Sequence, residues 1–302
     1  MSTPERPQFS VIIAVYNDWA PLEGCLRALE AQANCPEFEV IVIDDGSREH
    51  APESIRREAR FAFTLLEQPH AGISVARNLG IQHSKGSVLV FTDADCRPAP
   101  DCLSALEAAI SVRAQDRCFQ LHLTGDLSTV VGRAEELRLM TLQAKMLQPD
   151  GHIRYLNTAG FAIRRSHPRV ESGLFDPAAL RAEDTLLLVN LMQAGELPFF
   201  AKGAIVSHSI SLSFLGCLCK DIRSAWLEGK TCDMIASMGV RMRMENRERM
   251  EMLRSTWRAA REHRIGGTAW FVLLTRQLVE RTVSLFYALR GSESATQAGV
   301  DF

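Results

Sequence analysis

The stretch FEVIVIDDGS, residues 38–47, is an apolar, β-branched run that ends abruptly in two aspartates. Such a run predicts a short buried strand, and the residues after it predict a turn at the strand's carboxyl end. A second run with the same kind of ending, VLVFTDAD, occupies residues 88–95. Each of the two predicted strands therefore has a pair of carboxylates at its carboxyl end.

The segments around these two runs alternate between strand and helix patterns. Alternation of this kind predicts βαβ units and a mostly parallel, Rossmann-like α/β sheet that is covered on both faces. In such sheets a ligand lies beyond the carboxyl ends of the strands, so we expect both acidic pairs at the ligand site. The expected strands are 9–15, 38–43, 63–67 and 88–92, and the expected helices are 52–60, 72–85, 100–112 and 185–193.

Composition excludes several classes of protein. The chain has 302 residues, 46% hydrophobic and 23% charged, as in an ordinary globular protein. Its net charge of -2 argues against a dedicated nucleic-acid binder. The charge is uneven, because residues 203–302 hold 14 basic and 10 acidic residues. A basic last third is compatible with contact to phosphates or to a membrane surface.

Localisation follows from cysteine usage and from the apolar stretches. Eight cysteines are too sparse for a disulfide scaffold, so we expect reduced, mostly buried thiols and a cytoplasmic protein. The start shows no secretory signal pattern. The most apolar late stretch, residues 265–275, is about half of the ~20 residues that a membrane span requires. Peripheral contact with the inner membrane face stays open.

The two acidic pairs, Asp44 with Asp45 and Asp93 with Asp95, predict a metal-assisted phosphate site. Helix capping explains one aspartate at each strand end but not two pairs. Neighbouring carboxylates repel by about 1 kcal/mol in water and about 4 kcal/mol at a dielectric of about 20. A divalent ion, Mn²⁺ or Mg²⁺, would relieve this repulsion and hold a diphosphate. The P-loop and GxGxxG patterns are absent, which excludes those two phosphate cradles.

Four motifs occur in order along the chain: VIIAVYND (11–18), VIDDGS (42–47), AGISVARNLGIQHSKGSVLVFTDADC (71–96) and GLFDPAALRAEDTLLLVNLMQAG (173–195). Together they resemble family 2 glycosyltransferases, which are inverting enzymes with the GT-A nucleotide-sugar-binding fold. The resemblance implies transfer of a sugar from a nucleotide-diphosphate donor, a UDP-sugar, to an acceptor hydroxyl. It covers about residues 9–210, so we expect a catalytic domain at 1–210 and a helical extension at 211–302.

The resemblance places the nucleobase at the ends of the first two strands. Val15, Tyr16 and Asn17 would line the base, with Tyr16 contacting the uracil. Asp44 would accept a hydrogen bond from the base, and Asp45 would organise that pocket.

The resemblance places the ribose, the diphosphate and the metal nearby. Arg77 and Asn78 would border the nucleotide. Asp93 would contact the ribose or a metal-bound water, and Asp95 would ligate the metal through the diphosphate. His208 is either a metal-side ligand near the diphosphate or a structural histidine.

Inverting transfer needs one general base that takes the proton of the acceptor hydroxyl. The family's ED motif maps onto Glu183 and Asp184, and Asp184 is the preferred base. Without the upstream motifs, the same pair would be explained as acids favoured at a helix start. The segment NTAGF, residues 157–161, matches the family segment that lines the donor sugar and the acceptor, through Asn157, Ala159 and Gly160.

The last third of the chain is predicted to be helical. Residues 212–230 form an amphipathic pattern. The resemblance implies that a segment here closes over the diphosphate or the acceptor, and Arg223 and Trp226 are the candidates for this contact. Residues 241–264 are arginine-rich and predict a solvated helix. Residues 270–289 carry an apolar stripe that predicts packing on the domain itself or on a second subunit, or else contact with a membrane surface.

Two other functions remain as alternatives. A nucleotidyltransferase would need a glycine-rich basic loop after the first strand, and YNDWAPLEG lacks it. A catalytically inactive nucleotide-sugar-binding module is disfavoured because Asp95 and Asp184 are both present. The QxxRW motif of processive synthases is absent, which argues against a polymerising enzyme. The acceptor stays open among saccharides, lipid-linked molecules and peptide-derived molecules.

Overall fold

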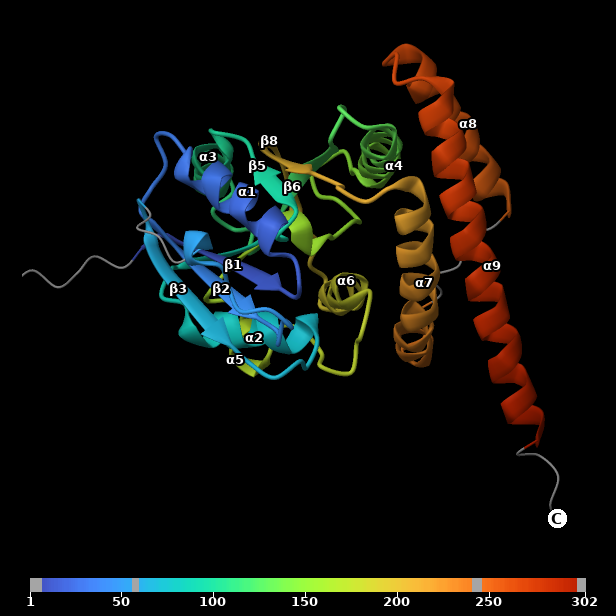
Figure 1. Cartoon of the computed structure of the whole chain (residues 1–302), viewed down its shortest axis with the longest axis horizontal. Helices are drawn as coiled ribbons and strands as arrows, with labels where there is room; N and C mark the ends of the chain where they lie inside the picture. The colour runs from blue at the N-terminus through green and yellow to red at the C-terminus, as the bar shows by residue number, and fades with distance from the viewer. Residues whose placement is uncertain (1–6, 56–59, 241–245, 298–302) are drawn as a thin grey trace, which may run out of the picture.

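The computed structural model describes residues 7–55, 60–240 and 246–297, and a single mixed sheet lies at its centre (Figure 1). The strand order is β3-β2-β1-β4-β7-β6-β8-β5. The strands are β1 Phe9–Val15, β2 Phe38–Asp44, β3 Ala62–Glu67, β4 Val88–Phe91, β5 Cys96–Pro98, β6 Cys118–Gly125, β7 Phe161–Arg164 and β8 Phe199–His208.

Helices connect the strands and then form the last part of the described chain. The α-helices are α1 Trp19–Glu30, α2 Ile73–His83, α3 Cys102–Val112, α4 Val130–Met146, α5 Pro168–Ser172, α6 Glu183–Gln193, α7 Phe214–Ser237, α8 Asn246–Glu262 and α9 Gly267–Gln297. Two short 3-10 helices, η1 and η2, cover Glu53–Ile55 and Thr158–Gly160.

The predicted parallel arrangement is confirmed for the strands that carry the two acidic pairs. Strand β1 pairs in parallel with β2 and with β4, and β2 pairs in parallel with β3. Their carboxyl ends therefore share one edge of the sheet, and the segments that follow β2 and β4 emerge there. Beyond β4 the sheet becomes mixed, because β7 is antiparallel to both β4 and β6.

Successive residues of β1 point into two different apolar layers. Val11 and Ile13 are buried in the layer that includes side chains of α1 and α3. Ile12 is buried in the other layer, with side chains of α2 and α6. This alternation is the period of two expected of a strand covered on both faces. A Cβ added to Gly80 of α2 would lie 2.6 Å from Ile12 Cγ2, so the glycine lets α2 pack closely on the sheet.

Most expected elements lie within a few residues of their predicted positions. Of the helix expected over 52–60, the structure describes a 3-10 turn at Glu53–Ile55, and residues 56–59 lie outside the described part. The predominantly buried thiols are confirmed, because five of the eight free cysteines are buried.

The helices after residue 210 lie against one side of the molecule. Figure 1 shows α7 between α6 and α9, with α8 beside α9. Residues 241–245 of the expected arginine-rich helix lie outside the described part, and α8 covers its remainder. Within the residues that the structure describes, no helix is both long and apolar enough to cross a membrane. The division of the chain at residue 210 stays a prediction.

Candidate active site

A cavity of about 730 Å³ lies where the carboxyl ends of the central strands meet helices α4, α6, α7 and α9. Side chains from the whole length of the chain line it, and most of them are polar or charged. The predicted site residues among them are Val15, Tyr16, Asp45, Arg77, Asp93, Asp95, Asn157, Ala159, Glu183, Asp184 and His208.

Asp45 is buried and its carboxylate holds the start of α2. Its Oδ1 accepts the backbone N–H of Ala71, and its Oδ2 accepts that of Gly72, each at 2.9 Å. Nδ1 of His70 lies 2.8 Å from Oδ2. These bonds satisfy amide donors that precede the helix, as capping carboxylates do. Asp45 therefore organises the loop before α2 and also borders the cavity.

Asp44 and Asn17 stabilise the loops behind the cavity and do not line it. Oδ1 of Asp44 accepts the backbone N–H of Ser47 at 2.8 Å. The backbone N–H of Asn17 donates to the Ser47 hydroxyl at 2.8 Å, and the Asn17 amide oxygen accepts the N–H of Arg48 at 2.9 Å. Asn17 has a φ of 59°, a left-handed conformation that asparagine tolerates better than most residues. Their predicted contacts with a base stay predictions.

Tyr16 offers an aromatic face at the mouth of the cavity. Its ring stacks on that of His70, with centroids 4.2 Å apart and an interplanar angle of 21°. Tyr16 remains 38% exposed, so a planar group can still reach the ring. His70 was not predicted. Its proximity to Asp45 and Tyr16 depends on how the loop before α2 folds back over the β1 end.

Arg77 joins two of the predicted motifs. Its Nη2 donates to Asp93 Oδ1 at 2.8 Å, and its Nη1 donates to Glu183 Oε1 at 2.5 Å. The Arg77 side chain is only 1% exposed. The next residue, Asn78, points elsewhere, exchanging hydrogen bonds with the backbone of Phe175 at 2.7 and 3.2 Å. Arg77 therefore belongs to the cavity, whereas Asn78 anchors the loop before α6.

Glu183 and Asp184 open α6 after a left-handed residue, Ala182, with a φ of 57°. Glu183 is neutralised by Arg77, but Asp184 has no such cation on its carboxylate. Its Oδ1 accepts the backbone N–H of Thr185 at 2.6 Å. Burial, and then the neighbouring Glu183 charge, raise the pKa of Asp184 to about 7. A carboxyl with this pKa can exchange a proton near neutral pH.

Asp95 and His208 are in contact, and both line the cavity. His208 Nε2 lies 3.1 Å from Asp95 Oδ2, and its Nδ1 lies 3.8 Å from Glu135 Oε1. Burial opposes a charge on the ring, but hydrogen bonds to Asp95 and Glu135 outweigh it and raise the pKa of His208 to about 10. The imidazolium is therefore held between two carboxylates at neutral pH.

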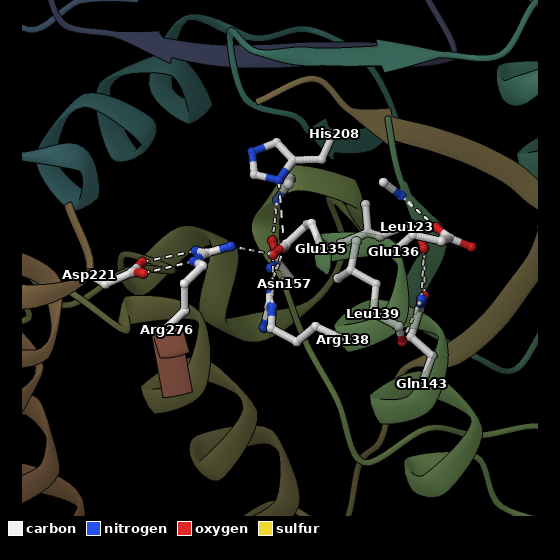
Figure 2. A network of polar contacts seen from close by, with 12 residues as sticks. Leu123, Glu135, Glu136, Arg138, Leu139, Gln143, Asn157, His208, Asp221 and Arg276 are labelled. Atoms are coloured by element: carbon white, nitrogen blue, oxygen red, sulfur yellow. Dashed lines mark hydrogen bonds and ion pairs between the residues drawn. The ribbon is translucent and has the colours of Figure 1, made fainter. Parts of the chain in front are cut away.

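A network of charges connects His208 to the outer helices, as Figure 2 shows. Glu135 of α4 accepts two bonds from Arg138 and lies 3.4 Å from Arg276 Nη1. Arg276, on α9, also makes a bidentate pair with Asp221 on α7, at 2.7 and 2.9 Å. None of these four residues was predicted. They lie on helices where no local pattern distinguishes them from a solvated charge.

The NTAGF segment is held beside β4 and β6. The backbone N–H of Asn157 donates to the buried Gln120 side chain at 2.8 Å, and Thr92 donates to Ala159 O at 3.0 Å. A Cβ on Gly160 would lie 2.7 Å from Leu123 Cδ2, so this glycine allows close packing on β6. Asn157 and Ala159 line the cavity, but Gly160 lies behind them.

The two acceptor-side candidates on α7 lie outside the cavity lining. Arg223 and Trp226 border a separate apolar groove with Val283 and Phe286 of α9. The α7 residues that do line the cavity include Asp221 and Glu228. The two sets of residues lie on different faces of α7. The sequence pattern does not specify which of these faces turns toward the cavity.

The donor set fits a hard divalent cation that takes part of its ligands from a substrate. In the described part of the chain, no cluster of three or more His, Cys, Asp or Glu side chains could hold a metal. Asp93 and Asp95 nevertheless present carboxylates that are 34% and 27% exposed. Mg²⁺ and similar ions are commonly bound by one or two carboxylates together with waters and substrate phosphates. Each carboxylate already has a cation beside it, because Arg77 pairs with Asp93 and His208 with Asp95. The predicted role of Asp95 as the metal ligand stays a prediction.

Comparisons with known proteins point to a family. The family model described as Glycosyl transferase family 2 matches residues 10–167. Glycosyltransferase AglE of Haloferax volcanii is 37% identical over 114 residues, which cover 36% of this chain and 37% of that protein. The putative glycosyltransferase EpsH of Bacillus subtilis is 32% identical over 108 residues, 35% of this chain and 31% of that protein. The chain thus spans only about a third of the length of these relatives.

Solved structures share the fold. A mannosyltransferase of Pyrobaculum calidifontis, PcManGT, in complex with GDP-Man and Mn²⁺, matches with a TM-score of 0.57 and 18% identity, over 99% of this chain and 82% of that one. GalNAc-T7 with UDP, GalNAc and Mn²⁺ matches with a TM-score of 0.53 and 18% identity, over 76% of this chain and 52% of that one.

Proposed function

Because the chain belongs to glycosyl transferase family 2, we propose that it transfers a sugar from a UDP-sugar to an acceptor hydroxyl with inversion. The observation that carries the proposal is one cavity bordered by Tyr16, Asp95 and Asp184. These residues offer a stacking surface, a metal-binding carboxylate and a base, and they come from three separate motifs. Relatives of known structure bind nucleotides and Mn²⁺, which supports the donor class.

The donor would lie across the strand ends. The Tyr16 ring can stack on the base, while Asp45 keeps the adjoining loop in place. Asp95, with His208 behind it, would hold Mn²⁺ or Mg²⁺. When bound, the ion supplies positive charge to the diphosphate as it leaves. Arg77 keeps Asp93 and Glu183 in fixed positions, so the cavity is organised before the donor arrives.

Asp184 would act as the general base. It takes the proton from the acceptor hydroxyl as that oxygen attacks the anomeric carbon. A new carbon–oxygen bond forms on one face of the sugar while the bond to the diphosphate breaks on the other, which inverts the configuration. Glu183 is bonded to Arg77, so its carboxylate positions the turn and leaves the proton transfer to Asp184.

Calorimetry tests the donor class without any knowledge of the sugar. UDP, GDP, CDP and dTDP are titrated into the wild type, Asp95→Ala and Asp101→Ala, with Mn²⁺ or with a chelator. We expect UDP to bind in the presence of Mn²⁺, and we expect Asp95→Ala to lose this binding. Asp101 precedes α3 and does not line the cavity, so its variant is the matched control. Absence of binding by all four nucleotides would refute the proposal.

A further inference from the structure

The outward face of α9 is apolar. Phe271, Leu278, Leu285 and Phe286 are 65%, 65%, 49% and 66% exposed. Their spacing places them along one side of the helix, over about 22 Å at 1.5 Å per residue. The opposite side, which includes Leu273, is buried and packs toward α4 and α7. Only part of the apolar surface of α9 is therefore buried in the interior.

Helix α7 extends the same surface. Ile222 and Trp226 are exposed and, with Val283 and Phe286, line an apolar groove of about 420 Å³ between α7 and α9. This groove lies outside the cavity described above. Ile222, Trp226, Phe271, Leu278, Leu285 and Phe286 are referred to below as the α7–α9 apolar surface.

The charges beside the α7–α9 apolar surface are mainly basic. Arg223, Arg281 and Arg290 are exposed, and the Arg290 guanidinium lies 5.8 Å from the ring centroid of Trp226. Residues 267–290 contain one acidic residue, Glu280, which lines the cavity on the inner side of α9. On α7, the Asp233 carboxylate accepts a hydrogen bond from Tyr287 at 3.0 Å.

We propose that the α7–α9 apolar surface docks onto an anionic lipid bilayer. Anionic headgroups would supply the counter-charge for the arginines, while the phenylalanine and leucine side chains enter the boundary with the acyl chains. Trp226 is also of the type enriched at this boundary. A second copy of the chain fits less well, because pairing α9 with itself would bring arginines together without a carboxylate on that face.

Flotation with lipid vesicles tests this proposal independently of sugar transfer. Vesicles of phosphatidylcholine alone, or mixed with phosphatidylglycerol, are compared for the wild type and the double variant Leu278→Glu/Phe286→Glu. The wild type should float with the anionic vesicles, and the variant should bind them about tenfold less or weaker still. Val112→Glu, at an exposed apolar position on α3, is the matched control and should bind like the wild type.

A second double variant, Arg281→Gln/Arg290→Gln, tests the charge requirement. It should lose most of the preference for anionic vesicles, and wild-type binding should weaken as sodium chloride is added. UDP binding by each variant verifies that the fold is intact. The proposal is overturned if the wild type does not float, or if Leu278→Glu/Phe286→Glu floats equally well. It is also overturned if light scattering shows a wild-type dimer that this variant abolishes.

Discussion

At the scale of single residues, the site depends most on Arg77, because this buried guanidinium bonds Asp93 and Glu183 at the same time. A planar group with several donors in fixed directions can bridge two carboxylates, whereas an ammonium acts as a compact point charge. The arginine thereby connects the segment after β4 to the start of α6.

We expect Arg77→Lys to destabilise the fold, by about 3 kcal/mol or more, because it leaves one buried carboxylate without its partner. Urea unfolding of the wild type and the variant measures the difference in free energy. Arg27→Lys is a suitable control, because Arg27 pairs with Glu23 on the surface and its side chain is 58% exposed. Equal stability of Arg77→Lys and the wild type would contradict the bridging role.

Asp184→Asn should lower the transfer rate by about 10²-fold or more, since an amide cannot accept the acceptor proton. The wild-type rate should rise with pH up to about 7 and then level off, because only the ionised Asp184 is a base. Asp176→Asn, in the loop before α6, should keep wild-type activity. A normal transfer rate in Asp184→Asn would exclude Asp184 as the base.

The same substitution should stabilise the protein at alkaline pH. The folded-state pKa of Asp184, about 7, lies above its ordinary value of 3.8, so the folded state holds the proton more tightly. The free energy of unfolding of the wild type therefore falls as pH rises from about 4 to 7. Asparagine does not ionise, so Asp184→Asn should gain about 1 kcal/mol or more over the wild type at pH 8. Thermal or urea unfolding at pH 5 and pH 8 measures the change.

At the scale of elements, α9 is joined to α7 and α4 by charges that reach the cavity. Arg276 carries the bidentate pair with Asp221 and the contact with Glu135, which in turn lies beside His208. Helix α9 therefore contributes to the position of the residue that contacts Asp95. A helix held in this way affects both the stability of the fold and the position of His208 in the cavity.

A double-mutant cycle on Asp221→Ala and Arg276→Ala should give a coupling free energy of about 2 kcal/mol or more, because both side chains are largely buried. The exposed pair Arg247 and Glu251 on α8 should give about 0.5 kcal/mol or less. Urea unfolding of the wild type and of the six variants measures both couplings. Equal coupling in the two pairs would show that α9 is not held by this contact.

At the scale of the whole molecule, the cavity has two sides that come from different parts of the chain. The strand ends supply Asp45, Asp93 and Asp95, and the C-terminal helices supply Asp221 and Arg276. Because these residues come together only on folding, a ligand that fills this cavity binds the folded state and not the unfolded chain. Binding should therefore stabilise the whole fold by mass action.

UDP with Mn²⁺ should raise the melting temperature of the wild type, with a gain of about 2.7 kcal/mol when the ligand exceeds its Kd by about 100-fold. The chelator should abolish the shift. Asp184→Asn should keep it, because the proposed base contacts the acceptor, whereas Asp95→Ala should lose it. A shift that survives both the chelator and Asp95→Ala would refute metal-assisted binding.

Much of the fold could be predicted, because apolar runs and turn residues are local signals. The runs at 9–15 and 38–43 correspond to β1 and β2, and the aspartates do follow β2 and β4. The helix expected at 52–60 is a 3-10 turn at Glu53–Ile55 in the part of this segment that the structure describes. Asp44 and Asn17 lie on predicted loops, yet their hydrogen bonds point to neighbouring backbone and not into the cavity.

The sequence by itself determined the alternation of strands and helices and the carboxylates at the strand ends, because spacing and turn chemistry act over a few residues. Only the tertiary structure decided which side chains meet. Arg77 reaches Glu183 across 106 positions, and Arg276 reaches Glu135 across 141. Such pairings depend on how packed layers are stacked, and no local pattern specifies that. The inward face of α7 was decided in the same way, which turned Arg223 and Trp226 away from the cavity.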